Sequence, residues 1–151
     1  MKNKKDVKLY NVLFPLWMLM IFPITWIVVL PGNFLIDSAV LLIALKVFKV
    51  TEIKEWYKKH ILKIFIFGMI ADVIGCAWML LMVILEVGNT GDEPYITIPA
   101  MLISCVMIYV FNYFITFKKA ENPIRKKLAI TFAIATAPVT FLVPSSWLYG
   151  F

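Results

Sequence analysis

Residues 61–87 read ILKIFIFGMIADVIGCAWMLLMVILEV, and this stretch decides the fold. It is long enough to cross a bilayer, because about 20 apolar residues suffice for a transmembrane helix. One carboxylate, Asp72, lies near its midpoint. A charged side chain at the bilayer centre costs roughly 2.5–3.5 kcal/mol on insertion scales. We therefore expect a membrane helix that turns Asp72 toward protein or water, with the rest of the chain packed against it.

The composition of this 151-residue chain is also that of a membrane protein. Hydrophobic residues make up 62% of it and lie in long runs, whereas soluble domains contain roughly 45–50%. The runs predict an all-α, polytopic bundle with five transmembrane helices, forming a single transmembrane domain over residues 1–151. The expected spans are residues 11–30, 34–50, 61–87, 95–117 and 128–150.

The first two spans are separated by Pro31-Gly32-Asn33, a sequence typical of a tight turn. An alternative for this region is a re-entrant hairpin over residues 11–45, followed by three transmembrane helices. Such a hairpin requires protein or water to cover its non-helical backbone. Residues 51–60, which follow, are expected either as a helix at the membrane surface or as a charged, solvated loop. Pro138 is expected to interrupt the last span.

Basic residues indicate the orientation of the chain. All 15 Lys and Arg residues fall into three clusters between the apolar runs, Lys2–Lys8, Lys46–Lys63 and Lys118–Lys127. Such clusters normally face the cytoplasm and anionic lipid headgroups. We expect a protein of the plasma membrane, with a cytoplasmic amino terminus and an extracytoplasmic carboxyl terminus. The net charge of +6 does not predict nucleic-acid binding, because the bases flank every span on one side only.

Small residues at helical spacing predict two faces for helix packing. One face lies in the third span and the other in the fifth, and they comprise Gly68, Ala71 and Gly75, and Ala129, Ala133 and Ala137. Small side chains let the backbones of two membrane helices approach closely. We expect the two faces to meet. The same faces could bind a second copy of the chain or another membrane protein.

Polar residues within the spans are the candidate functional sites. Asp72 has no Lys or Arg at its depth, so it must be protonated, hydrogen-bonded, solvated or bound to a cation. At about 1.5 Å of rise per residue, Thr136 and Thr140 bracket this depth, and one of them is expected to hydrogen-bond Asp72. Asp37 is expected about 10 Å away in depth, which favours two stations on an ion path over a shared-proton pair. Asn112 should hydrogen-bond another helix.

No enzyme signature occurs in the sequence. The motifs of phosphate-binding loops, zinc proteases and serine hydrolases are missing, and the G-x-G-D pattern of intramembrane aspartyl proteases does not fit around Asp72. Cys76 and Cys105 form no C-x-x-C pair, so we expect no metal site and no cofactor. We therefore expect that the protein is not an enzyme.

Two functions remain open from the sequence. The first is a small transport or permeation protein in which the intramembrane carboxylates serve as ion or proton stations. Five spans do not divide into two equal repeats, so such a pathway would need a homo-oligomer or a partner subunit. The second is a non-catalytic accessory, assembly or immunity-type subunit that binds another membrane protein through its small-residue helix faces.

Overall fold

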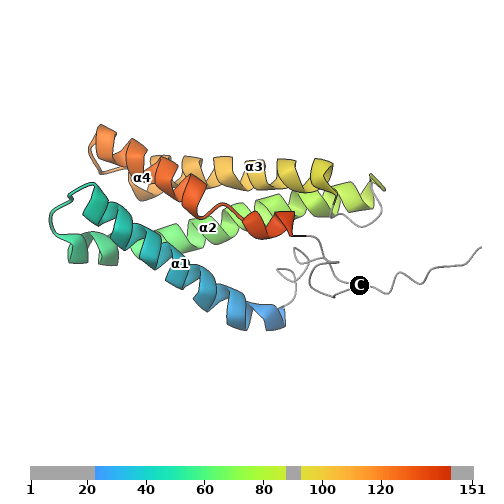
Figure 1. The fold of residues 1–151 in the computed structure, drawn as a ribbon, viewed down its shortest axis with the longest axis horizontal. Helices are drawn as coiled ribbons and strands as arrows, with labels where there is room; N and C mark the ends of the chain where they lie inside the picture. Colours follow the sequence, from blue (N-terminus) through green and yellow to red (C-terminus); the bar gives the residue numbers. More distant parts are fainter. Residues whose placement is uncertain (1–22, 88–92, 144–151) are drawn as a thin grey trace, which may run out of the picture.

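The computed structural model describes residues 23–87 and 93–143, and this part of the chain is all-helical (Figure 1). Four α-helices form an elongated bundle: α1 (Trp26–Val47), α2 (Ile53–Ile84), α3 (Pro94–Phe111) and α4 (Asn122–Ala135). Three shorter turns complete it. The 3-10 turn η2 (Pro23–Thr25) precedes α1, the π-helical turn η3 (Asn112–Thr116) continues α3, and the 3-10 turn η4 (Val139–Leu142) follows α4.

Three helices in the described residues are long and apolar enough to cross a membrane. They are Pro23–Val47, Ile53–Ile84 and Pro94–Thr116. The third agrees closely with the predicted span 95–117, and Pro99 is accommodated within α3. The predicted all-helical membrane bundle is therefore confirmed in outline, while the count of five transmembrane helices is not confirmed.

The predicted turn at residues 31–33 is wrong, because α1 runs through it without a break. Pro31 lies inside α1, where membrane helices tolerate proline because neighbouring groups satisfy the freed backbone. Residues 34–50 are mostly the second half of one helix, and the alternative hairpin over residues 11–45 loses its turn as well. Most of the first predicted span, residues 11–30, lies outside the described residues.

Helix α2 begins eight residues before the predicted span 61–87, since it starts at Ile53 and absorbs the charged connector. Its 32 residues measure roughly 48 Å at the usual rise, which exceeds the roughly 30 Å hydrocarbon core of a bilayer. Glu55 precedes Lys58 and Lys59 by three and four residues, a spacing that stabilises a helix. Helix α2 is therefore longer than a single crossing requires, and its first turns carry the charged residues.

The last predicted span, residues 128–150, is not one helix in the described part. Helix α4 starts earlier, at Asn122 with Pro123 in its first turn, and ends at Ala135. The chain resumes as η4 only after Pro138, which is buried. Proline lacks an N–H and disfavours helical backbone at the residue before it. The predicted interruption at Pro138 is confirmed, and residues 144–150 lie outside the described residues.

Helices α1 and α2 both end in a left-handed residue that is not glycine. Lys49 has φ 53° and Glu86 has φ 54°. In each case this residue's N–H bonds the carbonyl three residues back, and the next N–H bonds the carbonyl five residues back. This is the Schellman pattern, which satisfies the last carbonyls of a helix and is usually built around glycine. Both helices therefore end at defined positions, with local backbone strain.

The buried core lies in two parts. The larger part is shared by all four helices and includes Leu41, Leu45, Ile64, Phe117 and Phe132. The smaller part lies further along α2, where Cys76 and Met79 pack against Ile96 and Ala100 of α3 and Phe141 of η4. Residues far apart in the sequence thus hold η4 against α2 and α3, which fixes the break after α4 within the bundle.

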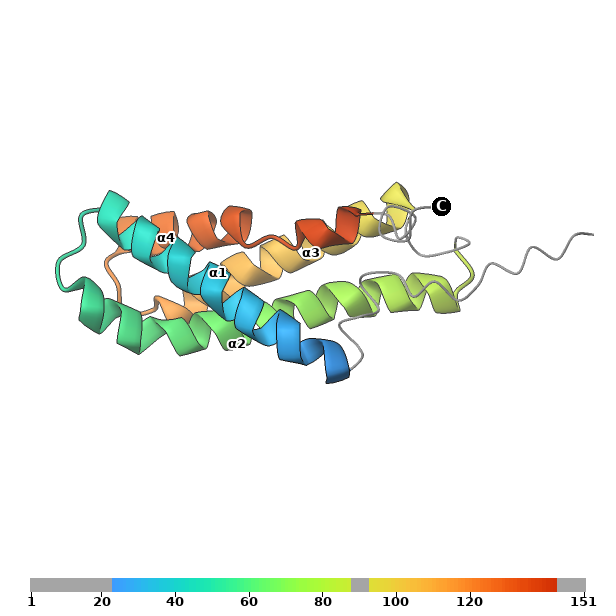
Figure 2. The same cartoon turned by 60° about the horizontal axis from the view of Figure 1, so that its bottom comes forward.

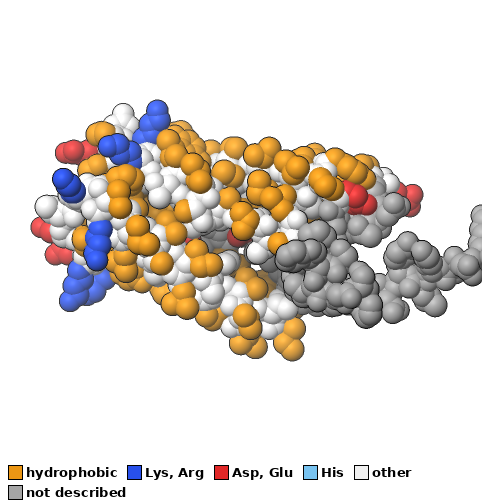
Figure 3. All heavy atoms as spheres, in the orientation of Figure 1, with side chains coloured by type: hydrophobic (Ala, Val, Ile, Leu, Met, Phe, Trp, Pro, Cys, Tyr) orange, Lys and Arg blue, Asp and Glu red, His pale blue; other side chains and the backbone are white. Residues whose placement is uncertain are grey.

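On the face seen in Figure 3 the bundle is apolar along its length, and Lys and Arg gather at one end beside some acidic side chains. Ile24, Ile27 and Val28 are each about three-quarters exposed, and the amino-terminal half of α1 leans away from the other helices in both ribbon views (Figures 1 and 2). Large apolar surfaces of this extent are not stable in water. They are compatible with a protein embedded in a membrane.

Candidate functional site

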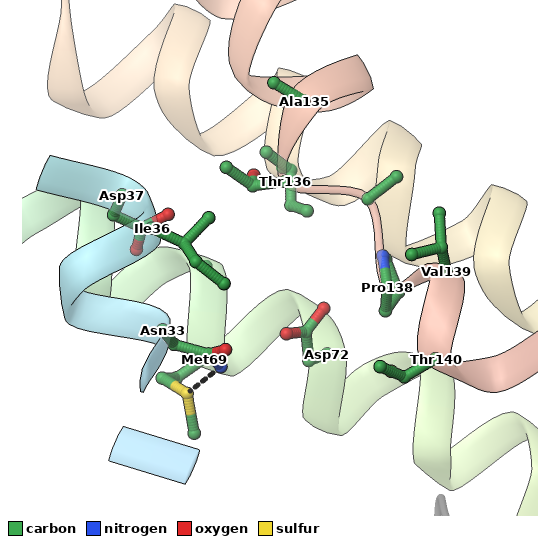
Figure 4. A pocket seen from close by; sticks show the side chains of 13 residues that line it. Asn33, Ile36, Asp37, Met69, Asp72, Ala135, Thr136, Pro138, Val139 and Thr140 are labelled. Carbon is green, nitrogen blue, oxygen red and sulfur yellow. Dashed lines mark hydrogen bonds between the residues drawn. The ribbon is translucent and has the colours of Figure 1, made fainter. Parts of the chain in front are cut away.

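A cavity of about 170 Å³ lies between α1, α2 and the segment that joins α4 to η4 (Figure 4). Four of the five residues predicted as polar stations line it: Asp37, Asp72, Thr136 and Thr140. Each wall comes from a different part of the chain. The continuity of α1 and the break after α4 are the two local features that bring these walls together.

Helix α1 contributes Asn33 and Asp37, which are one helical turn apart. Asp37 is buried, with 6% of its surface exposed. The Asn33 amide Nδ2 donates a hydrogen bond of 3.2 Å to Met69 Sδ on α2. Asn33 was predicted to lie in a turn, and it was not among the predicted polar stations. Its i,i+4 spacing from Asp37 was the signal that could have identified it.

Helix α2 contributes Gly68, Met69 and Asp72. A β-carbon at Gly68 would lie 3.8 Å from Asp37 Oδ2, so Asp37 packs over the bare backbone of α2. Asp72 follows one turn later, about 6 Å along the helix. Asp72 is 8% exposed, and its Oδ1 is buried without a hydrogen-bond partner in the described residues. The two carboxylates therefore share a cavity, closer in depth than the sequence indicated.

The third wall is the interruption between α4 and η4. Thr136 closes the end of α4, and its hydroxyl donates a 2.8 Å hydrogen bond to the carbonyl of Phe132. That back-bond engages the hydroxyl proton that we expected Asp72 to accept. Thr140 lines the cavity from η4, and Pro138 lies between the two threonines. A helix end leaves its last carbonyls without helical partners, and here those of Phe132 and Ala133 accept hydrogen bonds from side chains.

Asn112, the fifth predicted polar station, does not line this cavity. It is buried in the first position of η3, and neither Oδ1 nor Nδ2 has a hydrogen-bond partner in the part of the chain that the structure describes. The expected bond to another helix is therefore not observed.

The predicted packing residues hold the bundle around the cavity. Ser104 on α3 donates a 3.1 Å hydrogen bond to the carbonyl of Ala71. A β-carbon at Gly75 would overlap Ser104 Oγ and lie 3.1 Å from the carbonyl oxygen of Ala100. The small-residue face of α2 therefore packs closely against α3.

The second small-residue face also packs against α3. The carbonyl of Ala133 on α4 accepts a 3.1 Å hydrogen bond from Cys105 Sγ, and Ala129 is fully buried. Gly68 and Ala137 line the same cavity, but each face packs against α3 and not against the other face.

The polar side chains that line the cavity offer oxygen atoms as ligands. Its lining, within residues 23–87 and 93–143, contains no Lys, Arg or His. The same described ranges hold no group of three or more His, Cys, Asp or Glu residues that could bind a metal ion. Two carboxylates, an amide and two hydroxyls suit a proton or a hard cation, for which oxygen is the preferred ligand.

No family model matches this chain, and no curated protein or solved structure matches it either. The function is therefore argued from the cavity and from the membrane character of the bundle.

Proposed function

We propose that this chain is a small transport or permeation protein that passes a monovalent cation, H⁺ or Na⁺, through the cavity between Asp37 and Asp72. The observation that carries the proposal is that two buried carboxylates line one cavity whose described lining has no basic side chain. Carboxylates are costly within a membrane and mark ion or proton pathways when they face a cavity. A bound proton or monovalent cation would offset one of the two negative charges.

The interruption beside the cavity supports the same function. Broken membrane helices often line transport sites, because their unwound carbonyls can coordinate a cation. Here the break spans Thr136–Pro138, and Asp72 faces it across the cavity. Backbone oxygen atoms and the two carboxylates would then share the coordination of one ion.

The membrane arrangement that we infer has the basic end of the bundle in the cytoplasm of a plasma-membrane protein. The three long helices cross the bilayer, and α4 together with η4 forms a fourth, broken crossing that leads the carboxyl terminus out of the cytoplasm. A fifth crossing and a cytoplasmic amino terminus depend on residues 1–22. A bundle this small would form its pathway as a homo-oligomer or with a partner subunit.

The accessory-subunit function has less support. It relied on small-residue faces that remain free to bind another membrane protein. In this bundle Gly75, Ala129 and Ala133 are buried or packed against α3. Little of either face is left for a partner.

Flux into proteoliposomes that contain the purified chain tests the proposal, with one pH-sensitive dye and one sodium-sensitive dye inside. Asp72→Asn and Asp37→Asn should each slow the flux at least tenfold, which corresponds to about 1.4 kcal/mol. Glu86→Gln is the matched control, since it removes one carboxylate that is exposed and outside the cavity. Wild-type liposomes without flux of either ion, or unchanged flux in both aspartate variants, would contradict the proposal.

A further inference from the structure

A second recess, of about 230 Å³, lies at the basic end of the bundle, between the first turns of α2 and the end of α3. Lys59, His60 and Lys63 of α2 line one side. Thr116 of η3 and the following Lys118 and Lys119 line the other, with Ile115. Figure 3 shows the basic side chains gathered at this end of the molecule.

The recess has an excess of positive charge. Four lysines line it, and within the described residues no acidic side chain does. Glu52 and Glu55 line an adjoining hollow that shares only Lys59, His60 and Lys119 with it. Four ammonium groups around one recess repel each other unless an anion lies between them. The lysines are exposed to solvent, and their shared positive charge favours an anion over a cation in this recess.

Thr116 brings to the wall of the recess a hydroxyl that has no hydrogen-bond partner in the described residues. It is only 3% exposed, and its Oγ1 is buried with no hydrogen-bond partner in the described part of the chain. In a regular helix this hydroxyl could bond the carbonyl four residues back, at Asn112, but in the π-helical turn that carbonyl accepts from the N–H of Phe117. Buried hydroxyls without a partner are rare in proteins, and single π-turns frequently occur at functional sites.

His60 makes the floor of the recess rigid. Its ring stacks on Trp56, with centroids 4.8 Å apart, and lies 5.5 Å from the ring of Phe117. Nδ1 is 2.9 Å from the carbonyl of Trp56, so Nδ1 carries the hydrogen and donates it. The contact between His60 on α2 and Phe117, which follows η3, holds the two sides of the recess together. The backbone positions of the lysines and of Thr116 are therefore held in place relative to each other.

We propose that this recess binds a phosphate group, with Lys59, Lys63, Lys118 and Lys119 supplying the charge and the Thr116 hydroxyl a directed hydrogen bond. Phosphate offers several strong acceptor oxygens to donors that converge from two elements, which a smaller anion cannot do. Its source is either the headgroup of an anionic phospholipid in the adjacent leaflet or a soluble phosphate ester. The inference does not depend on the transport of any ion.

Native mass spectrometry of the full chain in neutral detergent tests the proposal, with phosphatidylglycerol as the probe and phosphatidylcholine as the uncharged comparison. Lys118→Ala/Lys119→Ala should weaken phosphatidylglycerol binding roughly thirtyfold, since each lysine near an anionic lipid attracts its headgroup. The matched control is Lys126→Ala/Lys127→Ala, which removes the same charge from the same segment but from outside the recess. These side chains are not buried, so both variants should fold.

Thr116→Val separates a phosphate site from general surface charge. It keeps the shape of the side chain and removes the hydroxyl, so phosphatidylglycerol binding should fall several-fold without a lower Tm, while Thr116→Ser should bind as the wild type does. If inorganic phosphate or glycerol phosphate competes with the lipid, the ligand is a soluble phosphate; if neither competes, it is the lipid headgroup. Equal losses in the two double-lysine variants, or undiminished binding by Thr116→Val, would overturn the proposal.

Discussion

The carboxylate of Asp37 lies over Gly68, so that a β-carbon at residue 68 would come 3.8 Å from Asp37 Oδ2. That separation is an ordinary van der Waals contact. Gly68→Ala should therefore fold, with a Tm equal to or above that of the wild type, because alanine is the better helix former by roughly 1 kcal/mol. Its methyl group adds bulk to the cavity wall beside Asp37, and flux in proteoliposomes should fall severalfold. Wild-type flux in a folded Gly68→Ala protein would show that the cation does not pass this wall.

Gly75, two turns along α2, has no such room. Its β-carbon would overlap Ser104 Oγ and lie 2.8 Å from Phe141 Cε2. Gly75→Ala should destabilise the bundle by about 1–3 kcal/mol, the range for overpacked cores, and lower the Tm in detergent. Ser104→Ala alone should also destabilise, by about 1 kcal/mol, because it removes the bond to Ala71.

The double variant Gly75→Ala/Ser104→Ala tests whether this contact is direct. Removal of Ser104 Oγ relieves the closest of the three contacts that the new methyl group makes, so the double variant should be less destabilised than the sum of the two single variants. Coupling of this kind is expected between residues in contact. Additive losses would mean that α2 and α3 are further apart at this position.

Glu86 allows a stabilising prediction. It holds a left-handed backbone, with φ 54°, at the end of α2, a conformation that costs a non-glycine residue roughly 1–2 kcal/mol. Glu86→Gly should raise the Tm. Glu86→Ala is the control, since it removes the same charge from the helix end but keeps the strain, so the difference between the two variants isolates the backbone contribution. A Glu86→Gly protein no more stable than Glu86→Ala would contradict the prediction.

Labelling from one side of the membrane tests α1 as a single crossing. In a chain with both native cysteines replaced by alanine, Ile24→Cys and Lys49→Cys place one thiol at each end of the candidate span Pro23–Val47. In intact cells an impermeant maleimide should label residue 24 and leave residue 49 unlabelled. If the chain turned at residues 31–33, residue 24 would lie within the bilayer and would not react.

The sequence predicted those parts of the fold in which lipid and charge act on long segments. The span at 95–117, the membrane character of 61–87, the basic end and the break at Pro138 all follow from hydropathy, charge and the missing proline N–H. The cavity was predicted only in part. Four of its lining residues were identified, Asp37, Asp72, Thr136 and Thr140, but their hydrogen bonds and relative depths differ from the prediction.

The errors came from signals that are reliable in water. Pro31-Gly32-Asn33 reads as a turn in a soluble protein, where water can bond the freed backbone groups. Inside a bilayer those groups have no such partner, so the helical conformation persists through them. Asn33 then became a lining residue one turn from Asp37. The π-helical turn at Asn112–Thr116 has no comparable signature in the sequence, and it decided the surroundings of Asn112 and Thr116.

The position of Asp72 near the middle of α2 has an electrical consequence. An ion that reaches it from the side opposite the lysines would cross about half of the membrane field, and a full crossing by one charge is worth roughly 2.3 kcal/mol per 100 mV. A negative interior would therefore favour occupancy by about 1.2 kcal/mol at that voltage, or roughly sevenfold. The resting potential of the cell would by itself increase the occupancy of the Asp72 site by a cation.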